Sequence, residues 1–183
     1  MPAEHGQTPH SAQAADVRML VLDVDGVCTD GKLYVDGSGH ALKCFHAHDG
    51  IGIKLALRAG LDIAVITGRD DPGVRARMTG LGVRHYFPGH EAKMPALRLL
   101  EEESGIKPAQ MAYLGDDFID LEPMAAVGMP MAVANARPEV LRAARYVTRL
   151  PGGEGAVREA VEWLLRERGL RDLAAVWLNG AQR

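Results

Sequence analysis

Short apolar segments recur along the chain from residue 17 onward and alternate with segments that have helical spacing. The first, residues 17–24, is almost continuously apolar, which is typical of a strand buried on both faces of a sheet. Similar segments predict further strands over residues 61–67, 83–87, 111–114, 130–133 and 146–148. Between them we expect helices over residues 49–59, 92–104, 118–126, 138–144 and 154–168, and one that begins near residue 72. This alternation predicts an α/β domain with a parallel sheet.

Two of these helices carry recognisable start signals. Asp49 is a favourable N-cap and Gly60 a favourable stop, because aspartate accepts from free backbone N–H groups and glycine tolerates the left-handed conformation. Asp71 followed by Pro72 places a capping carboxylate before a proline in the first helical turn. We therefore expect both helices to begin at these residues.

A segment with strand character, residues 32–45, interrupts the alternation directly after the first strand. Residues 32–35 and 40–45 flank the sequence Asp-Gly-Ser-Gly at 36–39, which is typical of a tight turn. The pattern predicts a β-hairpin at a position where a simple βαβ unit would enter its helix.

Composition and charge exclude several functional classes. The chain has 183 residues, close to the size of one domain at about 150 residues each. A formal charge of −3 and an aromatic content of 5% provide neither the basic field nor the stacking surface expected for nucleic-acid binding. No apolar run approaches the roughly 18 residues that span a membrane. We expect neither nucleic acid nor membrane as a partner.

Both ends of the chain differ in composition from its centre. Residues 1–16 are rich in Ala, Gln, His and Pro and lack the basic and apolar regions of a secretory signal. We expect a disordered tail over residues 1–16, one domain over 17–169 and a C-terminal tail over 170–183. Two cysteines, Cys28 and Cys44, make no disulfide framework, which favours a cytoplasmic location.

Polar side chains follow the predicted strands at the points where these strands end. Asp23 and Asp25 follow the first strand, Thr67 the second and Asp116 the fourth, and Lys93 comes after the third. Ligands of open parallel sheets bind beyond the carboxyl ends of the strands. Clustered carboxylates there would repel one another without a cation, and their hard oxygens suit Mg²⁺, whereas lysine and threonine suit phosphate oxygens. The cluster predicts phosphoryl transfer through an aspartyl phosphate.

The same positions carry a family resemblance. In chain order, DVDGVCTDG, ITGR, Lys93 and GDDFID resemble the four motifs of the haloacid dehalogenase superfamily of phosphatases. The segments GKLYVDGSGHALKCFHAHDGIGIK and YVTRLPGGEGAVRE extend the resemblance to the 3-deoxy-D-manno-octulosonate 8-phosphate phosphatase family, cytoplasmic enzymes of lipopolysaccharide sugar synthesis. The resemblance spans about residues 17–168. It implies a Rossmann-like, doubly wound parallel sheet with a β-hairpin flap and no cap domain.

The resemblance also implies roles for the polar residues at the strand ends. Asp23 would be the nucleophile and a Mg²⁺ ligand, and Asp25 the acid/base, with its backbone carbonyl on the metal. Asp116 would be the third protein ligand, while Thr67 and Lys93 would hold the phosphoryl group.

A reaction in two steps follows from these roles. Asp23 attacks phosphorus while Asp25 protonates the departing sugar oxygen, and Asp25 then activates the water that hydrolyses the phospho-aspartate. Asp117 and Asp120 are expected to orient Lys93 and nearby backbone groups.

Contacts to the sugar are implied for a further set of residues: His46, Ala47, His48, Asp49, Gly50, Lys54, Gly68, Arg69 and Arg77. Cationic side chains in this set suit a sugar-acid carboxylate. The chain departs from the family at His48, where arginine is expected, and at Lys54, where arginine is common. Lysine and arginine are not equivalent at a bidentate site, so the identity of the sugar acid stays open.

The spacing of the motifs leaves no room for a lid. Residues 25–49 accommodate only the hairpin, and residues 68–93 only one helix, one strand and a turn. Because this chemistry benefits from exclusion of water, either a large substrate or another subunit must cover the site. The resembling family forms homotetramers through its hairpins, and we expect the same assembly here.

Several alternatives remain open at this stage. The substrate could instead be a nine-carbon, sialic-type sugar acid 9-phosphate, or the domain could be non-catalytic and serve assembly. His46 and His48 could belong to a zinc site, although spacing places no third ligand. Arg77 could be a solvated helix residue, and the Gly-Gly-Glu-Gly run at 152–155 a simple loop before the last helix.

Overall fold

The computed structural model describes residues 13–39 and 41–180. A parallel sheet in the order β5-β4-β1-β6-β7-β8 forms its centre. The strands are β1 (Met19–Leu22), β4 (Asp62–Ile66), β5 (His85–Phe87), β6 (Met111–Gly115), β7 (Met129–Ala132) and β8 (Tyr146–Val147). Each lies at a position predicted from the apolar segments, and the doubly wound parallel sheet is confirmed.

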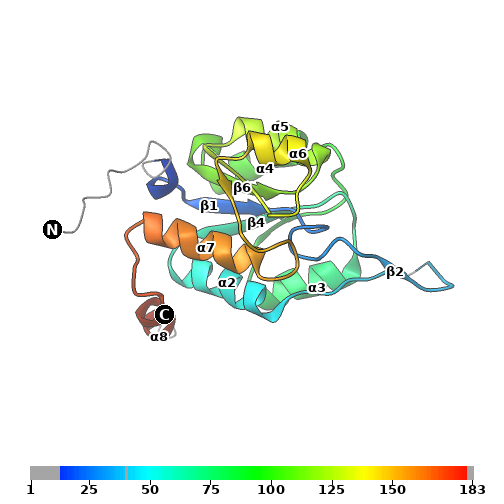
Figure 1. Cartoon of the computed structure of the whole chain (residues 1–183), viewed down its shortest axis with the longest axis horizontal. Coiled ribbons are helices and arrows are strands. Elements are labelled where there is room, and N and C mark those ends of the chain that lie inside the picture. Colours follow the sequence, from blue (N-terminus) through cyan, green and yellow to red (C-terminus); the bar gives the residue numbers. More distant parts are fainter. Residues whose placement is uncertain (1–12, 40, 181–183) are drawn as a thin grey trace.

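Helices cover both faces of this sheet (Figure 1). One layer holds α2 (Ala47–Arg58), α3 (Pro72–Leu81) and α7 (Ala156–Glu167), and the other α4 (Lys93–Ser104), α5 (Leu121–Ala126) and α6 (Pro138–Ala143). Two 3₁₀ turns, η1 (Pro108–Gln110) and η2 (Phe118–Asp120), flank β6, so the helix predicted over residues 118–126 begins as a 3₁₀ turn. The three-layer arrangement explains why β1 is apolar along its whole length.

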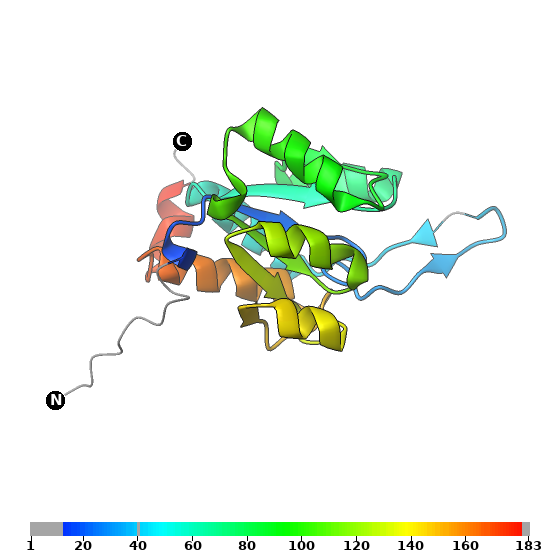
Figure 2. The same ribbon diagram turned by 90° about the horizontal axis from the view of Figure 1, so that it is seen from above.

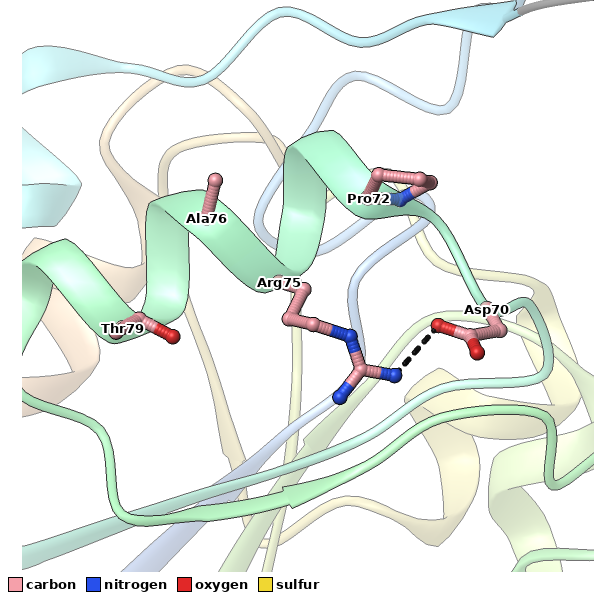
Figure 3. Close-up of a pocket in the computed structure, with 5 residues that line it drawn as sticks. All are labelled: Asp70, Pro72, Arg75, Ala76 and Thr79. Atoms are coloured by element: carbon pink, nitrogen blue, oxygen red, sulfur yellow. Dashed lines mark hydrogen bonds and ion pairs between the residues drawn. The ribbon is translucent and has the colours of Figure 1, made fainter.

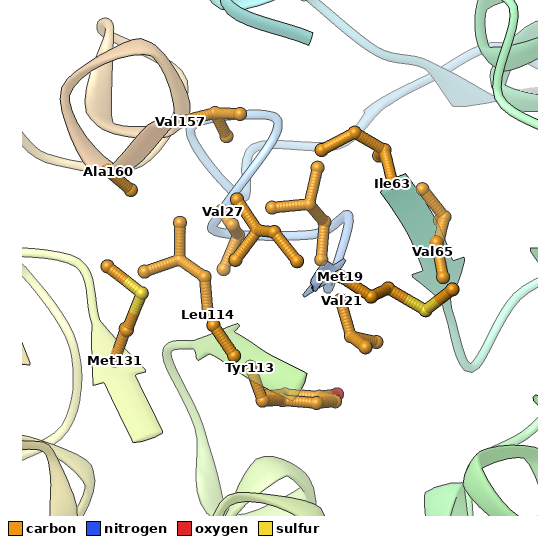
Figure 4. Packing of buried hydrophobic residues seen from close by; sticks show 14 of the residues in the cluster. Met19, Val21, Val27, Ile63, Val65, Tyr113, Leu114, Met131, Val157 and Ala160 are labelled. Carbon is orange, nitrogen blue, oxygen red and sulfur yellow. The ribbon is translucent and has the colours of Figure 1, made fainter. Parts of the chain in front are cut away.

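The hydrophobic core lies between the sheet and the two helix layers (Figure 4). Leu20 and Leu22 of β1 pair with Ile63 and Val65 of β4, and all four side chains are buried. Val157, one of the residues of α7 that close one side of the core, is likewise buried. This packing fixes the strand ends that carry the polar residues.

The predicted hairpin consists of two very short strands, β2 (Tyr34–Val35) and β3 (Ala41–Leu42). It projects away from the body of the domain in both views (Figure 2). The Asp36 carboxylate accepts from the backbone N–H of Ser38 at 2.8 Å, which stabilises the turn. Residue 40, part of the predicted second strand, lies outside the described residues.

The two chain ends contribute short ordered elements. Residues 1–12 of the predicted tail lie outside the described residues, whereas residues 13–15 are helical and Ala14 is buried, so this end of the tail belongs to the folded domain. Within the predicted C-terminal tail, α8 (Leu173–Asn179) lies against α2, with the Arg58 guanidinium 3.8 Å from the Trp177 ring centre. None of the helices in the described parts of the chain is long and apolar enough to cross a membrane.

Candidate active site

Strand register brings the polar residues to one rim of the sheet. Leu22 in β1 pairs with Val65 in β4 and Leu114 in β6, so the three neighbouring strands end at the same level. Asp23 and Thr67, each just past one of these ends, are both buried. The grouping predicted from the strand ends is therefore present in the fold.

A buried ion-pair network joins Lys93 to two carboxylates. Lys93 is the first residue of α4, and its Nζ lies 2.7 Å from Asp23 Oδ1 and 2.6 Å from Asp120 Oδ1. Burial disfavours the charged ammonium, but the charges of Asp23 and Asp120 outweigh it and raise the pKa of Lys93. The expectation that Asp120 orients Lys93 is confirmed.

Asp120 is the organising carboxylate of this rim. Besides Lys93, its Oδ1 accepts from the Tyr113 hydroxyl at 2.8 Å, and its Oδ2 accepts from the backbone N–H groups of Asp116 at 2.9 Å and Asp117 at 3.2 Å. Four donors thus surround a fully buried carboxylate, so its hydrogen-bonding capacity is used within the fold. The Asp117 side chain instead caps η2, accepting from the N–H of Phe118.

Asp23 and Asp116 form an acidic pair that suits a divalent cation. Together with Asp120 they are the candidate metal-binding group among the described residues, with one oxygen of each within 4.8 Å of the others. Burial, with the neighbouring carboxylates, raises the pKa of Asp116 to about 8, and burial raises that of Asp23 to about 6. A hard cation would relieve this cost, and the oxygen donors match its preference.

Gly26 lets Asp116 approach the loop that follows β1. Its φ of 98° lies in the left-handed region, and a Cβ there would collide with the Asp116 carboxylate. Only glycine satisfies both conditions.

Asp25, the predicted acid/base, lies against a lysine that the sequence did not single out. Lys43 Nζ, from the segment after β3, lies 2.7 Å from Asp25 Oδ1 and 2.8 Å from Oδ2. No local motif identifies Lys43, because the two residues meet only when the hairpin folds back to the sheet.

The Gly-Gly-Glu-Gly run packs directly on the loop after β1. A Cβ at Gly152 would collide with the backbone carbonyl of Gly26, and one at Gly153 with the backbone of Thr29 and Asp30. The N–H of Gly153 also donates to the Val27 carbonyl at 3.0 Å. The run is therefore more than a connection, since it braces the loop that carries Asp25 within the same chain.

The start of α2 differs from the prediction. His46 is its N-cap, with Nδ1 accepting from the N–H of His48 at 3.3 Å. The buried Asp49 carboxylate instead accepts from the backbone N–H groups of Gly155 at 3.3 Å and Arg158 at 2.8 Å, at the start of α7. Asp49 thus joins two helices, and its placement supports a structural role in place of a sugar contact.

A cleft of about 1000 Å³ lies between the hairpin and the start of α3. Its lining includes three cations, Lys43, Arg69 and Arg77, and three acids, Asp36, Asp70 and Asp71. Gly50 makes room for Arg77, because a Cβ there would collide with the Arg77 guanidinium. Arg77 is half-buried and lies 5.9 Å from the Phe45 ring centre, so it is not an ordinary solvated helix residue.

One of the three acids of this cleft, Asp70, is paired with an arginine outside it. Its carboxylate lies 2.9 Å from the Arg75 guanidinium in an adjoining pocket on α3 (Figure 3). α3 itself begins as predicted, with Asp71 capping and Pro72 at its start. Asp71 is used as the cap of α3, and Lys43 is paired with Asp25. Arg69 and Arg77 are therefore the lining cations without an ion pair among the described residues, and they suit an anionic ligand.

The remaining predicted sugar contacts are dispersed. Ala47 and Gly68 lie at the start of α2 and just after Thr67, near the rim. His48 lines a different pocket, with Arg149 and Arg158 of the α7 region. Lys54 lies about 10 Å along α2 from its first residue, at 1.5 Å per residue. The structure thus brings together Arg69 and Arg77 and separates His48 from them.

Two further expectations concern zinc and the cysteines. Among the described residues, His46 and His48 are not part of any candidate metal-binding group, and His46 Nδ1 is used as a cap. Cys28 is buried, with Sγ 3.1 Å from the Asp23 carbonyl, while Cys44 is exposed, and both are free thiols.

Comparisons with known proteins agree with this geometry. Residues 82–158 match the haloacid dehalogenase-like hydrolase family. The 3-deoxy-D-manno-octulosonate 8-phosphate phosphatase of Escherichia coli K12 is 44% identical over 163 residues, covering 89% of this chain and 87% of the relative.

Two solved structures are similar over nearly their whole length. A 3-deoxy-D-manno-octulosonate 8-phosphate phosphatase from Moraxella catarrhalis, in complex with magnesium, phosphate and KDO, has a TM-score of 0.89, 31% identity and coverage of 94% and 99% of the two chains. The cobalt-bound deoxy-D-mannose-octulosonate 8-phosphate phosphatase from Haemophilus influenzae has a TM-score of 0.86, 39% identity and coverage of 91% and 99%. With the acidic pair, these relatives support a divalent metal site. The chain belongs to the 3-deoxy-D-manno-octulosonate 8-phosphate phosphatase family of haloacid dehalogenase-like hydrolases, and is a phosphoric monoester hydrolase.

Proposed function

We propose that this hydrolase converts 3-deoxy-D-manno-octulosonate 8-phosphate to the free sugar acid and phosphate, with Mg²⁺ and a phospho-aspartate intermediate. The observation that carries the proposal is the buried contact between Lys93 and Asp23 beside Asp116. A carboxylate held by a lysine within an acidic cluster suits attack on a phosphate that is anchored by the same lysine. Family membership supplies the substrate class.

Asp23 is the nucleophile in this mechanism. Lys93 fixes the Asp23 carboxylate through Oδ1, so that the reacting group is held in one orientation before substrate arrives. Lys93 and the Thr67 hydroxyl then hold the phosphoryl oxygens as negative charge develops on them. Mg²⁺, held by Asp23, Asp116 and the Asp25 carbonyl, would neutralise the charge between nucleophile and phosphate.

Asp25 moves the protons. It protonates the departing sugar oxygen as the phospho-aspartate forms, and then accepts a proton from the water that hydrolyses that intermediate. The loop that carries Asp25 is braced by Gly152 and Gly153, which favours a constant position of the acid/base in both steps.

Sugar recognition is assigned to the cleft between the hairpin and α3. Arg69 and Arg77 suit the carboxylate of the sugar acid, with Gly50 making room for Arg77. A homotetramer built on the exposed hairpins would cover this open cleft with a neighbouring chain. We place the enzyme in the cytoplasm, as the family resemblance implies.

A nine-carbon sugar acid 9-phosphate is the second candidate substrate. The observation that favours it is the departure from the family pattern at His48 and Lys54, which changes the polar groups of α2. Both candidates use the same rim and differ only in the sugar.

The test is phosphate release from a panel of sugar-acid phosphates, with and without Mg²⁺, for the native protein and Asp23→Asn. We expect the eight-carbon substrate to have the highest kcat/KM and EDTA to abolish turnover. Preference for the nine-carbon substrate would replace the proposed substrate, and turnover by Asp23→Asn would overturn the mechanism.

A further inference from the structure

We propose that Lys43 is a positioning residue that directs the Asp25 carboxylate toward the leaving group, and so connects the hairpin to the chemical step. The inference rests on the proposed function of Asp25 as the acid that protonates the departing oxygen. It adds a residue outside the four motifs at the strand ends to the machinery of the reaction.

The contact itself fixes a direction. Lys43 Nζ lies 2.7 Å from one Asp25 oxygen and 2.8 Å from the other, so the ammonium faces both oxygens of the carboxylate. A charged partner at this distance holds a short side chain more firmly than a neutral one. Rotation of the Asp25 carboxylate away from Lys43 would lose both contacts.

The burial of Lys43 shows that the contact is part of the fold. Its side chain is only 3% exposed, whereas Lys32, at the other end of the hairpin, has a side chain that is 69% exposed. Lysine is rarely buried without a partner, because desolvation of the ammonium is costly. Among the ion pairs of the described residues, Asp25 is the partner of Lys43.

Burial alternates along residues 42–45, the end of β3 and the segment that follows it. Lys43 and Phe45 are the less exposed residues of this stretch. Phe45 packs against the core, while Leu42 and Cys44 are exposed. The packing of Phe45 and the ion pair of Lys43 with Asp25 together hold the base of the hairpin against the rim.

Lys43 also lines the cleft that we assign to the sugar acid. It thus contacts the acid/base and borders the space where the departing sugar would be placed. A movement of the hairpin that displaced Lys43 would be transmitted to Asp25 through the paired oxygens. This is a physical link between the segment expected to join subunits and the proton-transfer step.

Leaving groups of different basicity separate this role from a general structural one. A general acid contributes most when the departing oxygen is strongly basic and little when it is a stable anion. Phenyl phosphate and 4-nitrophenyl phosphate are close in size but differ in this respect. The kcat/KM for each reports the step in which the phospho-aspartate forms and the leaving group departs.

The experiment compares Lys43→Met with Lys32→Met, a matched change at the exposed lysine of the hairpin. We expect Lys43→Met to lower kcat/KM for phenyl phosphate at least about tenfold more than for 4-nitrophenyl phosphate, a fraction of the roughly 10²–10⁴-fold supplied by a general acid. Lys32→Met should leave both values near those of the native protein, and Lys43→Arg should recover part of the loss on phenyl phosphate.

The outcomes are distinguishable. An equal loss on both aryl phosphates, or no loss, overturns the role of Lys43 while leaving the proposed function intact. Absence of Mg²⁺-dependent phosphate release by the native protein from any substrate overturns the proposed function itself. Circular dichroism and thermal unfolding show whether Lys43→Met folds. If it does not, Lys43→Arg decides: because the guanidinium lies farther from the backbone than the ammonium, we expect a smaller fall in kcat/KM, again larger for phenyl phosphate than for 4-nitrophenyl phosphate.

Discussion

The rim of the sheet buries charge, whereas the hairpin exposes apolar side chains. At the rim, Lys93 and Asp120 have no exposed side-chain surface, although each carries a charge. On the hairpin, Val35 and Leu42 are 61% and 73% exposed, although both are aliphatic. Each region reverses the usual placement of its residue type.

The two reversals have different physical reasons. Burying Lys93 beside Asp23 and Asp120 costs desolvation, which the mutual contacts offset, and the result is a rim whose charged groups are held in fixed positions. Exposing Val35 and Leu42 forgoes hydrophobic stabilisation within one chain, which a second chain would restore. The polar groups of the rim thus have partners within one chain, whereas the hairpin leaves apolar side chains exposed.

The largest expected effect is at the nucleophile. Asp23→Asn keeps the shape of the side chain but cannot form an acyl phosphate, so we expect kcat to fall by about 10⁴-fold or more. Phosphate release by the purified variant is the measurement, with Asp30→Asn, a change at a partly exposed side chain in the same loop, as the active control. Retention of more than a few per cent of native activity would contradict the assignment.

The next effect concerns the stability of the buried network. Asp120→Asn places an amide against Lys93 and removes the negative partner, so we expect a loss of about 3–5 kcal/mol of unfolding free energy. Tyr113→Phe removes only one of the four donors to Asp120 and should cost about 1 kcal/mol. Urea unfolding of both variants gives the two values. Equal losses would show that Asp120 is not the centre of the network.

The acidic pair predicts how pH and metal act together. The pKa of Asp116 is raised to about 8 and that of Asp23 to about 6, above the ordinary value near 3.9. These groups therefore stabilise the metal-free fold most below pH 4, and their contribution is lost as the pH rises toward 8.

Mg²⁺ should reverse this trend, because it binds the ionised carboxylates. We expect it to raise Tm more at pH 8 than at pH 5, with about 2.7 kcal/mol of stabilisation at a hundredfold excess over its Kd. Asp116→Ala should reduce this rise. A rise that is independent of pH would move the metal away from Asp23 and Asp116.

The sequence was sufficient to predict which residues meet at the rim, because the end of a strand can be recognised from the residues around it. Asp23, Thr67 and Asp116 follow apolar segments, and parallel strands bring such positions together. Lys43 was missed because nothing in its neighbourhood indicates the fold of the hairpin against Asp25. Asp49 was predicted to cap α2, the helix that contains it. The structure shows that it accepts from the start of α7 instead, and nothing in the sequence around Asp49 indicates a contact with so distant a segment.

A smaller effect is expected where two loops touch. Gly152→Ala would drive a methyl group into the Gly26 carbonyl, so the loop that carries Asp25 must move. We expect a loss of about 1–3 kcal/mol in stability, the usual cost of overpacking, and a parallel fall in kcat. Gly80→Ala is the control, because a Cβ at Gly80 meets nothing within 4 Å. Native activity in Gly152→Ala would show that the brace has no catalytic consequence.

The smallest effect on the fold of one chain is expected on the hairpin. Val35→Lys and Leu42→Lys change exposed side chains, so the unfolding free energy of the protomer should stay within about 0.5 kcal/mol. If the hairpins join four chains, both variants should nevertheless lower the sedimenting mass and the activity on the sugar phosphate. Activity on 4-nitrophenyl phosphate should fall less, since Asp23, Asp116 and Lys93 all come from one chain.

Leu99→Lys separates this effect from a general cost of adding charge. Leu99 is an exposed leucine on α4, away from the hairpin, and its replacement should change neither mass nor activity. An exposed two-stranded hairpin is marginal in water, and pairing with other chains is the usual way to stabilise one. Sedimentation of the native protein as a fully active monomer would refute the assembly. The hairpin would then cover only its own site, and Lys43 would transmit its position to Asp25 without a neighbouring chain.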